Sequence, residues 1–160
     1  MTEMRVGIGV DAHALEDGVP LVLGGVRIPW PRGLAGHSDG DVIAHALTDA
    51  ILGAANRGDI GSLFPSTDPA LKGADSLVLL AQAYEVVREA GWELVNADCV
   101  LIGQQPKIAP VREEMGRRLA AALGVEADRV AVRATTTDRL GFTGRGEGLA
   151  AQAVALLRRL

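Results

Sequence analysis

Residues 36–49 read Gly36-His37-Ser38-Asp39-Gly40-Asp41-Val42-Ile43-Ala44-His45-Ala46-Leu47-Thr48-Asp49 and hold two of the three histidines of the chain. Ser38 or Asp39 is suited to cap a helix, because its side-chain oxygen can accept a free N–H of the first turn. Apolar residues then recur at helical spacing, which predicts a helix over about 40–56 with an apolar stripe at Val42, Ala46, Leu47 and Ile51. The same helical period places the side chains of Asp41, His45 and Asp49 on a common face of the predicted helix.

This stretch would present an imidazole, a hydroxyl and a helix N-terminus at one place. His37 and Ser38 precede the helix, and His45 lies a turn or two inside it. A helix N-terminus favours anions, so the arrangement suits a metal ion together with a phosphate. The simpler alternative is that His37 caps the helix and that His45 is a core histidine with satisfied ring nitrogens.

The third histidine, His13, follows a predicted strand at Val6–Val10. Strand side chains alternate between faces, so Asp11 and His13 project from the same side if the strand continues. Together with His45 they form a set of three nitrogen and oxygen ligands. Three protein ligands with an open fourth position are typical of catalytic zinc rather than structural zinc.

The composition indicates one globular domain over residues 1–160. Hydrophobic residues make up 48% of the chain and aromatic residues only 3%, so we expect a core of aliphatic side chains. The net charge of −4 gives no reason to expect nucleic-acid binding. We expect a cytoplasmic protein with a buried, unpaired Cys99, because there is no second cysteine, no signal-peptide pattern and no apolar run of membrane-spanning length.

The order of the predicted elements is typical of an α+β fold with helices on one face of a sheet. The other face then needs a partner, which favours an oligomer packed sheet to sheet. Alanine dominates 149–157, so propensity predicts a final helix there. The other expected elements are a strand over 4–13, a hairpin over 21–28, a glycine-rich loop over 32–40, helices over 74–90 and 108–123, strands over 92–103 and 129–134, and a glycine-rich loop over 141–148.

The sequence resembles the family of 2-C-methyl-D-erythritol 2,4-cyclodiphosphate synthases over nearly its whole length. The motifs are long and follow the same order along the chain. They are Gly9-Val10-Asp11-Ala12-His13, Gly24-Gly25-Val26-Arg27-Ile28-Pro29, His37-Ser38-Asp39-Gly40-Asp41, His45-Ala46-Leu47-Thr48-Asp49-Ala50, Gly58-Asp59-Ile60-Gly61, Leu63-Phe64-Pro65, Ala134-Thr135-Thr136-Thr137 and Leu140-Gly141-Phe142-Thr143-Gly144-Arg145-Gly146-Glu147-Gly148.

The resemblance implies a homotrimer of ferredoxin-like (chorismate-mutase-like) subunits. Each subunit would have a mixed β-sheet with helices on one face, and the sheets would pack around the threefold axis with active sites between neighbouring subunits. It also implies a strand, not a helix, after Gly148, and we adopt the strand. The implied reaction cyclises 4-diphosphocytidyl-2-C-methyl-D-erythritol 2-phosphate, with attack of the 2-phosphate on the β-phosphorus and release of CMP, in non-mevalonate isoprenoid biosynthesis.

By the same resemblance, Asp11, His13 and His45 hold Zn²⁺, and Asp138 contacts a second ion, Mg²⁺ or Mn²⁺, bound with the substrate diphosphate. His37 and Thr136 match the pair that stabilises the transition state. The implied substrate-binding residues are Asp11, Ala12, His13, His37, Ser38, Asp59, Ile60, Gly61, Phe64, Pro65, Ser66, Thr67 and Asp68, then Gly103, Gln104, Gln105, Pro106, Lys107, Ile108, Ala109, Thr135, Thr136, Thr137 and Asp138 of the adjacent subunit, and Phe142 and Arg145 near the threefold cavity.

Two positions depart from the family pattern. The family often has Asp where this chain has Ser66, so one contact to a sugar hydroxyl is weakened. It usually has Glu where this chain has Asp138, a carboxylate that would touch the second metal.

Two other functions fit the same residues. A zinc phosphohydrolase would use the fourth zinc position to activate water and would need a general base such as Asp59. A non-enzymatic trimeric protein could hold a nucleotide in these sites and an isoprenoid diphosphate in the threefold cavity, near Phe142 and Arg145. That second alternative does not explain why Asp11, His13 and His45 form a set of zinc ligands.

Overall fold

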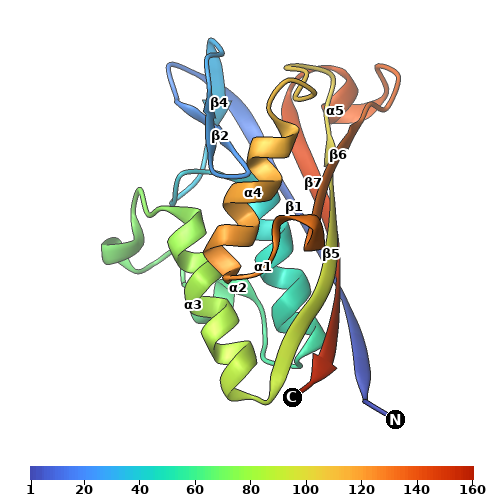
Figure 1. Cartoon of the computed structure of the whole chain (residues 1–160). Helices are drawn as coiled ribbons and strands as arrows, with labels where there is room; N and C mark the ends of the chain where they lie inside the picture. The colour runs from blue at the N-terminus through green and yellow to red at the C-terminus, as the bar shows by residue number, and fades with distance from the viewer.

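The computed structural model describes all residues, 1–160, as a curved mixed sheet covered by helices (Figure 1). A five-stranded sheet has the order β4-β1-β7-β5-β6, and a separate hairpin joins β2 to β3. The elements are β1 (Met4–Asp17), β2 (Leu21–Leu23), β3 (Val26–Ile28), β4 (Arg32–Leu34), α1 (Val42–Ala54), α2 (Ile60–Leu63), η1 (Pro69–Leu71), α3 (Ser76–Glu89), β5 (Trp92–Ile102), α4 (Arg112–Leu123), η2 (Ala127–Arg129), β6 (Val130–Thr135), α5 (Gly141–Gly144) and β7 (Gly148–Arg159).

The centre of the sheet is β7, which pairs antiparallel with both β1 and β5. The helix that alanine content predicts over 149–157 is therefore wrong, and the strand implied by the family resemblance is confirmed. Buried residues alternate along β7 from Ala151 onward, and three of those that face the helices are Ala151, Ala153 and Ala155. Small side chains at these positions leave room for α1 to lie close to the sheet, so tertiary packing overrides the local preference for a helix.

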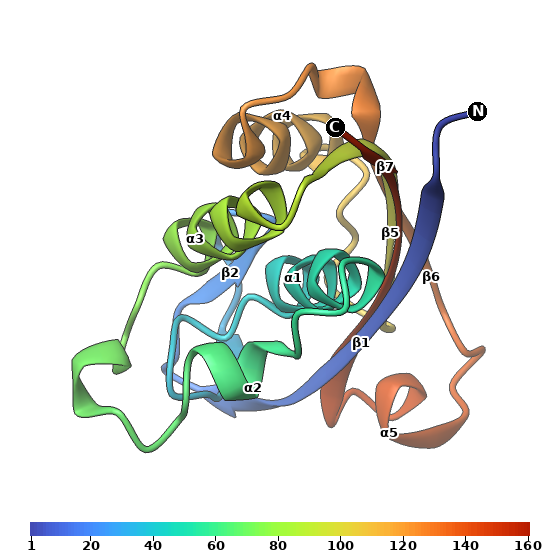
Figure 2. The same ribbon diagram turned by 90° about the horizontal axis from the view of Figure 1, so that it is seen from below.

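The three long helices α1, α3 and α4 lie on one side of the sheet, as expected, and its opposite side carries none of them (Figure 2). The bare face is rich in apolar side chains, particularly along β1. Those with large exposed fractions, between 41% and 68%, are Met4, Val6, Ile8, Val10 and Val154. Exposed apolar surface on this scale is unusual for an isolated chain and is typical of an interface.

Two glycines of β1 allow α1 to approach the sheet closely. A Cβ atom on Gly9 would lie 1.9 Å from the carbonyl oxygen of Ala46, and one on Gly7 would lie 2.0 Å from that of Ala50. Both obstacles are backbone atoms, which cannot move aside as a flexible side chain can. The helix thus rests directly on β1, and this contact sets the distance between side chains of α1 and those of β1.

The N-cap of α1 is Asp41, so the prediction that Ser38 or Asp39 caps this helix is wrong. The Asp41 carboxylate is fully buried and accepts hydrogen bonds from the N–H groups of Ala44, Gly24 and Gly25, at 3.1, 2.9 and 2.7 Å. Burial raises the pKa of Asp41 to about 6, while these three donors favour its charged form. The helix start is therefore occupied by the chain's own carboxylate, which ties it to the β2–β3 turn and removes the free anion site predicted there.

Several other boundaries differ from those predicted. The first strand continues to Asp17 instead of ending at residue 13, and Arg32–Leu34 forms a short strand paired with β1 where we expected only loop. The short helix α5 lies inside the glycine-rich stretch 141–148. The strand β4 and the helix α5 have only three or four residues, and the extension of β1 is held by pairing with another strand. Local periodicity therefore gives little indication of any of them.

The prediction of a buried Cys99 is confirmed. None of the helices is both long enough and apolar enough to span a membrane.

The glycine contact makes a stability prediction. Replacing Gly9 with Ala should lower the free energy of unfolding by about 3 kcal/mol, because the added methyl group meets backbone atoms of α1. Gly53→Ala, a change on α1 itself, is the matched control. A Cβ atom on Gly53 would lie 3.9 Å from its nearest neighbour, and alanine favours helix. Urea unfolding measures both variants. Equal stability of Gly9→Ala and the parent protein would contradict the close contact.

Candidate functional site

Three potential metal ligands meet where β1 faces α1. Asp11 Oδ2 lies 2.8 Å from His13 Nε2 and 3.1 Å from His45 Nδ1, and the two imidazole nitrogens are 3.4 Å apart. Ligand atoms around a tetrahedral zinc ion with bonds of about 2.0–2.1 Å lie roughly 3.3 Å from one another. The donor set and its spacing therefore fit a zinc ion, and these three residues form the one such cluster in the chain.

The charges of the cluster suit a cation. Burial opposes ionisation of Asp11, but hydrogen bonds from His13 and His45 hold its pKa at about 2, so it carries a full negative charge at neutral pH. Burial likewise opposes protonation of His45, but its hydrogen bond to Asp11 and the charge of Asp11 raise the pKa of the imidazole. A proton and a metal ion would thus compete for the same nitrogen, Nδ1 of His45.

A cavity of about 350 Å³ opens beside this cluster. The cluster's three ligands form part of its wall, together with many of the residues predicted to hold the substrate. The predicted residues that line it are Asp11, His13, His37, Ser38, His45, Ile60, Gly61, Phe64, Pro65, Ser66 and Thr67, and the sequence did not point to two others, Leu71 and Leu79. Those two are apolar and lie at helical or turn positions, where nothing in the sequence distinguishes a pocket wall from core.

Other predicted residues near this cavity have a structural task in the chain. The side chain of Asp59 accepts a hydrogen bond from Ser62 N–H at 2.8 Å and caps α2. Asp68 caps η1 in the same way, through Ala70 N–H at 2.9 Å. Neither Asp59, Asp68 nor Ala12 is among the lining residues.

His37 is held by the loop that follows α2. Its Nε2–H donates to the carbonyl oxygen of Asp68 at 2.7 Å, and its own carbonyl accepts from Gly73 N–H at 2.7 Å. The hydrogen bond at Nε2 leaves Nδ1 as the ring atom that can interact with a ligand. The orientation of His37 therefore depends on the position of the loop at Asp68.

A second cavity, of about 180 Å³, lies at the carboxyl ends of the parallel strands β5 and β6. The N–H groups of Lys107, Ile108 and Ala109 donate to no other protein group, which leaves three consecutive donors for a ligand. The lining residues predicted from the sequence are Gly103, Pro106, Lys107, Ile108, Ala109, Thr135 and Thr136, and the others are Leu101, Arg112 and Ala134.

The two cavities share no lining residue. His37 belongs to the first and Thr136 to the second, so one chain does not bring the predicted catalytic pair into one cavity. Gln104, Gln105 and Thr137 line neither cavity, although Gln104 Oε1 accepts a hydrogen bond from Arg139 N–H at 3.2 Å.

Asp138 lies apart from the ligand cluster, beside Thr136. Its Oδ1 accepts a hydrogen bond from the Thr136 hydroxyl at 3.3 Å, and its φ angle is +51°. The side chain of Phe142 is 43% exposed, and Arg145 pairs with Glu147 at 2.9 Å. All three predicted residues are thus at the surface of the single chain.

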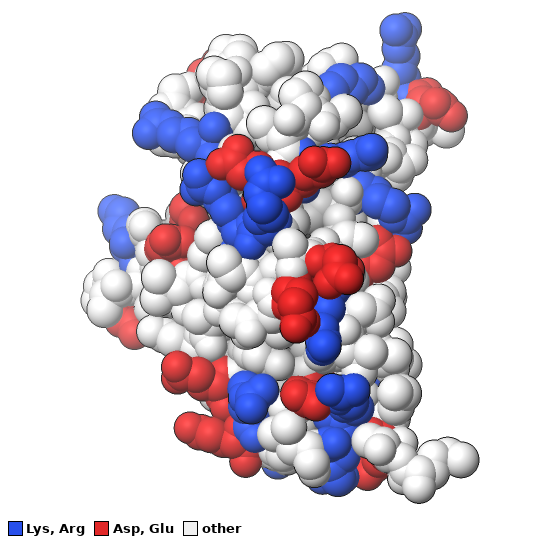
Figure 3. Space-filling model, viewed as in Figure 1, with Lys and Arg blue, Asp and Glu red and all other residues white.

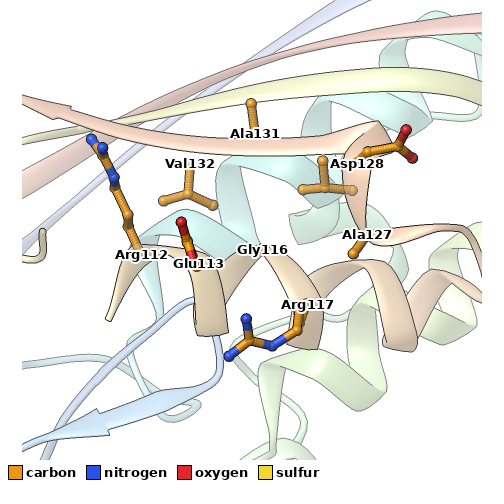
Figure 4. A pocket seen from close by; sticks show the side chains of 9 residues that line it. Arg112, Glu113, Gly116, Arg117, Ala127, Asp128, Ala131 and Val132 are labelled. Atoms are coloured by element: carbon orange, nitrogen blue, oxygen red, sulfur yellow. The ribbon is translucent and has the colours of Figure 1, made fainter. Parts of the chain in front are cut away.

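A further cavity of about 410 Å³ lies between α4 and the edge strand β6 (Figure 4). Arg112 and Glu113 extend from the start of α4 at one end, Asp128 lies at the other, and Arg117 points away from the strand. No predicted site residue lines it. On the face in Figure 3, basic and acidic side chains are interspersed rather than gathered into one charged region.

The chain is similar to several proteins whose names are known. A 2-C-methyl-D-erythritol 2,4-cyclodiphosphate synthase of Rubrobacter xylanophilus is 62% identical over 158 residues, which cover 97% of this chain and 95% of that protein. A solved structure of 2C-methyl-D-erythritol-2,4-cyclodiphosphate synthase in its CDP-bound form has a TM-score of 0.87 at 42% identity, covering 96% of this chain and 99% of that one.

A structure of the bifunctional IspDF from Campylobacter jejuni has a TM-score of 0.96 at 47% identity and covers 100% of this chain, which spans 43% of that longer protein. The model of the YgbB family matches residues 4–158. The chain therefore belongs to the YgbB family, in which its curated relatives are 2-C-methyl-D-erythritol 2,4-cyclodiphosphate synthases.

Proposed function

We propose that the chain cyclises 4-diphosphocytidyl-2-C-methyl-D-erythritol 2-phosphate to 2-C-methyl-D-erythritol 2,4-cyclodiphosphate and CMP, in isoprenoid biosynthesis. The observation that carries this proposal is the cluster of Asp11, His13 and His45 in the wall of a cavity, in a chain 62% identical to a named synthase. In this reaction an oxygen of the 2-phosphate bonds to the β-phosphorus. The bond from that phosphorus to the bridging oxygen breaks, and CMP leaves with this oxygen.

The reaction needs no nucleophile from the protein, because the substrate supplies both reacting groups. The protein must fold a flexible chain so that two anionic phosphates meet, which requires positioning and neutralisation of charge. Asp11, His13 and His45 would hold Zn²⁺, and bound zinc supplies Lewis acidity to a phosphate oxygen. Asp138 is the proposed protein ligand of the second ion, Mg²⁺ or Mn²⁺.

The remaining groups bind and orient the substrate. The hydrogen bond from His37 Nε2–H to the carbonyl oxygen of Asp68 leaves Nδ1 as the ring atom proposed to contact the attacking phosphate. The Thr136 hydroxyl is the proposed donor to the diphosphate, and the free N–H groups at 107–109 and the Lys107 ammonium are the proposed contacts for cytidine diphosphate. The CDP-bound form of a relative supports a nucleotide site in this fold.

We propose that the active enzyme is a homotrimer of ferredoxin-like subunits, packed sheet to sheet. Two observations support it: the apolar face that includes Ile8 is uncovered, and the two cavities are separate within one chain. A neighbouring subunit would bring its Lys107 and Thr136 to the zinc cluster and complete the site. A cavity on the threefold axis near Phe142 and Arg145 could hold an isoprenoid diphosphate. The proposed cellular location of the enzyme is the cytoplasm.

Product analysis tests the proposed reaction. Incubation of the protein with the substrate, Zn²⁺ and Mg²⁺ should produce the phosphorus NMR signals of a cyclic diphosphate and of CMP in equal amounts. An open-chain product that has gained water would indicate the zinc phosphohydrolase instead. Binding of the substrate without any new signal would indicate a non-enzymatic binding protein.

The trimer can be tested with two matched substitutions. Ile8 and Val78 are 60% and 50% exposed, on the bare sheet face and on α3 respectively. Ile8→Glu should produce a folded monomer without activity, because it places a charge in the middle of the proposed interface. Val78→Glu should remain an active trimer in sedimentation velocity. An active monomer would contradict a site shared between subunits.

The metal role of Asp138 predicts a change in magnesium dependence. Asp138→Asn keeps the shape, and asparagine tolerates the positive φ angle of +51°, but it removes the charge. It should raise the Mg²⁺ concentration needed for half-maximal rate, while Asp138→Glu should leave that concentration unchanged or lower it. Zinc content should be normal in both. An unaltered magnesium titration for Asp138→Asn would leave Asp138 as a turn residue only.

A further inference from the structure

Two segments that flank the metal cluster are joined side by side. The carbonyl of His37 accepts from Gly73 N–H at 2.7 Å, and Asp39 N–H donates to the carbonyl of Ala74 at 3.1 Å. The Asp39 carboxylate then accepts from the N–H of Ser76, at 3.0 Å, and from the Ser76 hydroxyl. This pair, which we call the Asp39–Ser76 clasp, ties the loop before α1 to the start of α3.

The Ser76 hydroxyl also lies 2.7 Å from Nε2 of His45. Ser76 is completely buried, so no solvent competes for these bonds. A hydroxyl group has a single proton, and that proton is donated to Asp39. The Ser76 oxygen therefore faces His45 with a lone pair and accepts the Nε2–H of the imidazole.

Ser38 is the competing acceptor. Its hydroxyl oxygen lies 3.0 Å from the same nitrogen, but it is also 3.4 Å from the Gly40 nitrogen and 3.5 Å from the Ser76 hydroxyl, and it has no carboxylate to take its proton. His45 Nε2 has one hydrogen to donate, so the shorter contact, to the hydroxyl whose proton is already committed, is the stronger one. Ser38 can take over part of this role if Ser76 is lost.

The clasp is more than the cap of α3. The N-cap of that helix is Asp75, whose side chain accepts from Leu77 N–H at 2.9 Å. The side-chain capping position is thus already filled; the Asp39 carboxylate adds a bond to the Ser76 N–H at the helix start, whereas the Ser76 hydroxyl makes no bond to the helix backbone. Together, the Ser76 hydroxyl and the Asp39 carboxylate orient the imidazole of His45.

We propose that Ser76, oriented by Asp39, is a positioning residue that fixes the ring and the tautomer of His45 for metal binding. With a hydrogen held on Nε2, Nδ1 is the ring nitrogen that a metal ion would occupy in place of a proton, and it lies 3.1 Å from Asp11 Oδ2 and 3.4 Å from His13 Nε2. Histidine ligands of metals are commonly held in this way by an acceptor on the other ring nitrogen. The inference rests on the metal site of the proposed function.

Zinc affinity measured by competition with a chromogenic chelator tests the proposal without reference to activity. Ser76→Ala should bind zinc about tenfold more weakly, at the lower end of the usual 10–100-fold effect, because Ser38 remains as a substitute acceptor. Ser38→Ala, the matched control, should lose less affinity than Ser76→Ala, and the double variant should lose the most. Ser76→Thr keeps the hydroxyl and should restore most of the affinity.

Thermal unfolding of the metal-free proteins separates positioning from stability. Metal-free Ser76→Ala should unfold at a somewhat lower temperature than the metal-free parent, because the buried polar groups of Asp39 and His45 each lose a partner. The stabilisation that added zinc provides should, in addition, be smaller for Ser76→Ala than for the parent or for Ser38→Ala. If Ser76→Ala does not fold, Asp39→Asn should show a weaker loss of zinc affinity in the same direction, since it removes the charge that holds the Ser76 proton.

The outcomes distinguish this proposal from the reaction itself. Unchanged zinc affinity in Ser76→Ala, or a larger loss in Ser38→Ala, would overturn the role of Ser76 even in an active synthase. A parent protein that binds no zinc would overturn the metal site and this inference together. A parent protein that binds zinc with the expected order of affinities but forms no cyclic product would support the inference and contradict the proposed reaction.

Discussion

The contact of α1 with β1 is the constraint on which the site depends. It is possible only because Gly7 and Gly9 carry no side chain where the backbone of the helix crosses them. The two elements then come close enough for His45 Nδ1 to lie 3.1 Å from Asp11 Oδ2. A larger separation would place the third ligand out of range, since metal bonds tolerate deviations of only a few tenths of an ångström.

The polar side chains around this contact are held by the chain itself. Asp41 joins the start of α1 to the β2–β3 turn, and Asp39 joins the preceding loop to α3. Both carboxylates accept N–H groups that a buried helix start or turn would otherwise leave unpaired, which is costly. The Asp39 carboxylate is bonded to Ser76, whose hydroxyl lies 2.7 Å from His45 Nε2, so one of these links reaches an imidazole. The proposed metal ligands come from a strand and a helix, while loops supply most of the remaining cavity wall.

The proposed site is divided between two places in one chain. The metal cluster lies on the helix side of β1, whereas the free N–H groups at 107–109 and Thr136 lie at the carboxyl ends of β5 and β6, where the chain leaves two parallel strands. The strand β7 separates β1 from β5 and keeps the two regions apart. Because the opposite face of the sheet is apolar and uncovered, association of copies is the physical route by which such halves could meet.

The sequence alone determined the features that depend on local periodicity. Alternation along a strand put Asp11 and His13 on one side, and helical spacing placed His45 inside a helix, so the ligand set could be predicted from residue types. The wall residues between 60 and 67 were predicted only from the family resemblance. The helices on one face of the sheet followed from the order of elements. The β2–β3 hairpin followed from its Gly-Gly turn.

Only the tertiary structure decided the features that depend on partners distant in the chain. Asp41 caps α1, rather than Ser38 or Asp39, because the N–H groups of Gly24 and Gly25 reach it from the hairpin. The alanine-rich segment at 149–157 is a strand because β1 and β5 pair with it on both sides, and a local preference for helix cannot outweigh two ladders of hydrogen bonds. The link from Ser76 to His45 likewise joins residues 31 positions apart, a distance over which no pattern in the sequence carries information.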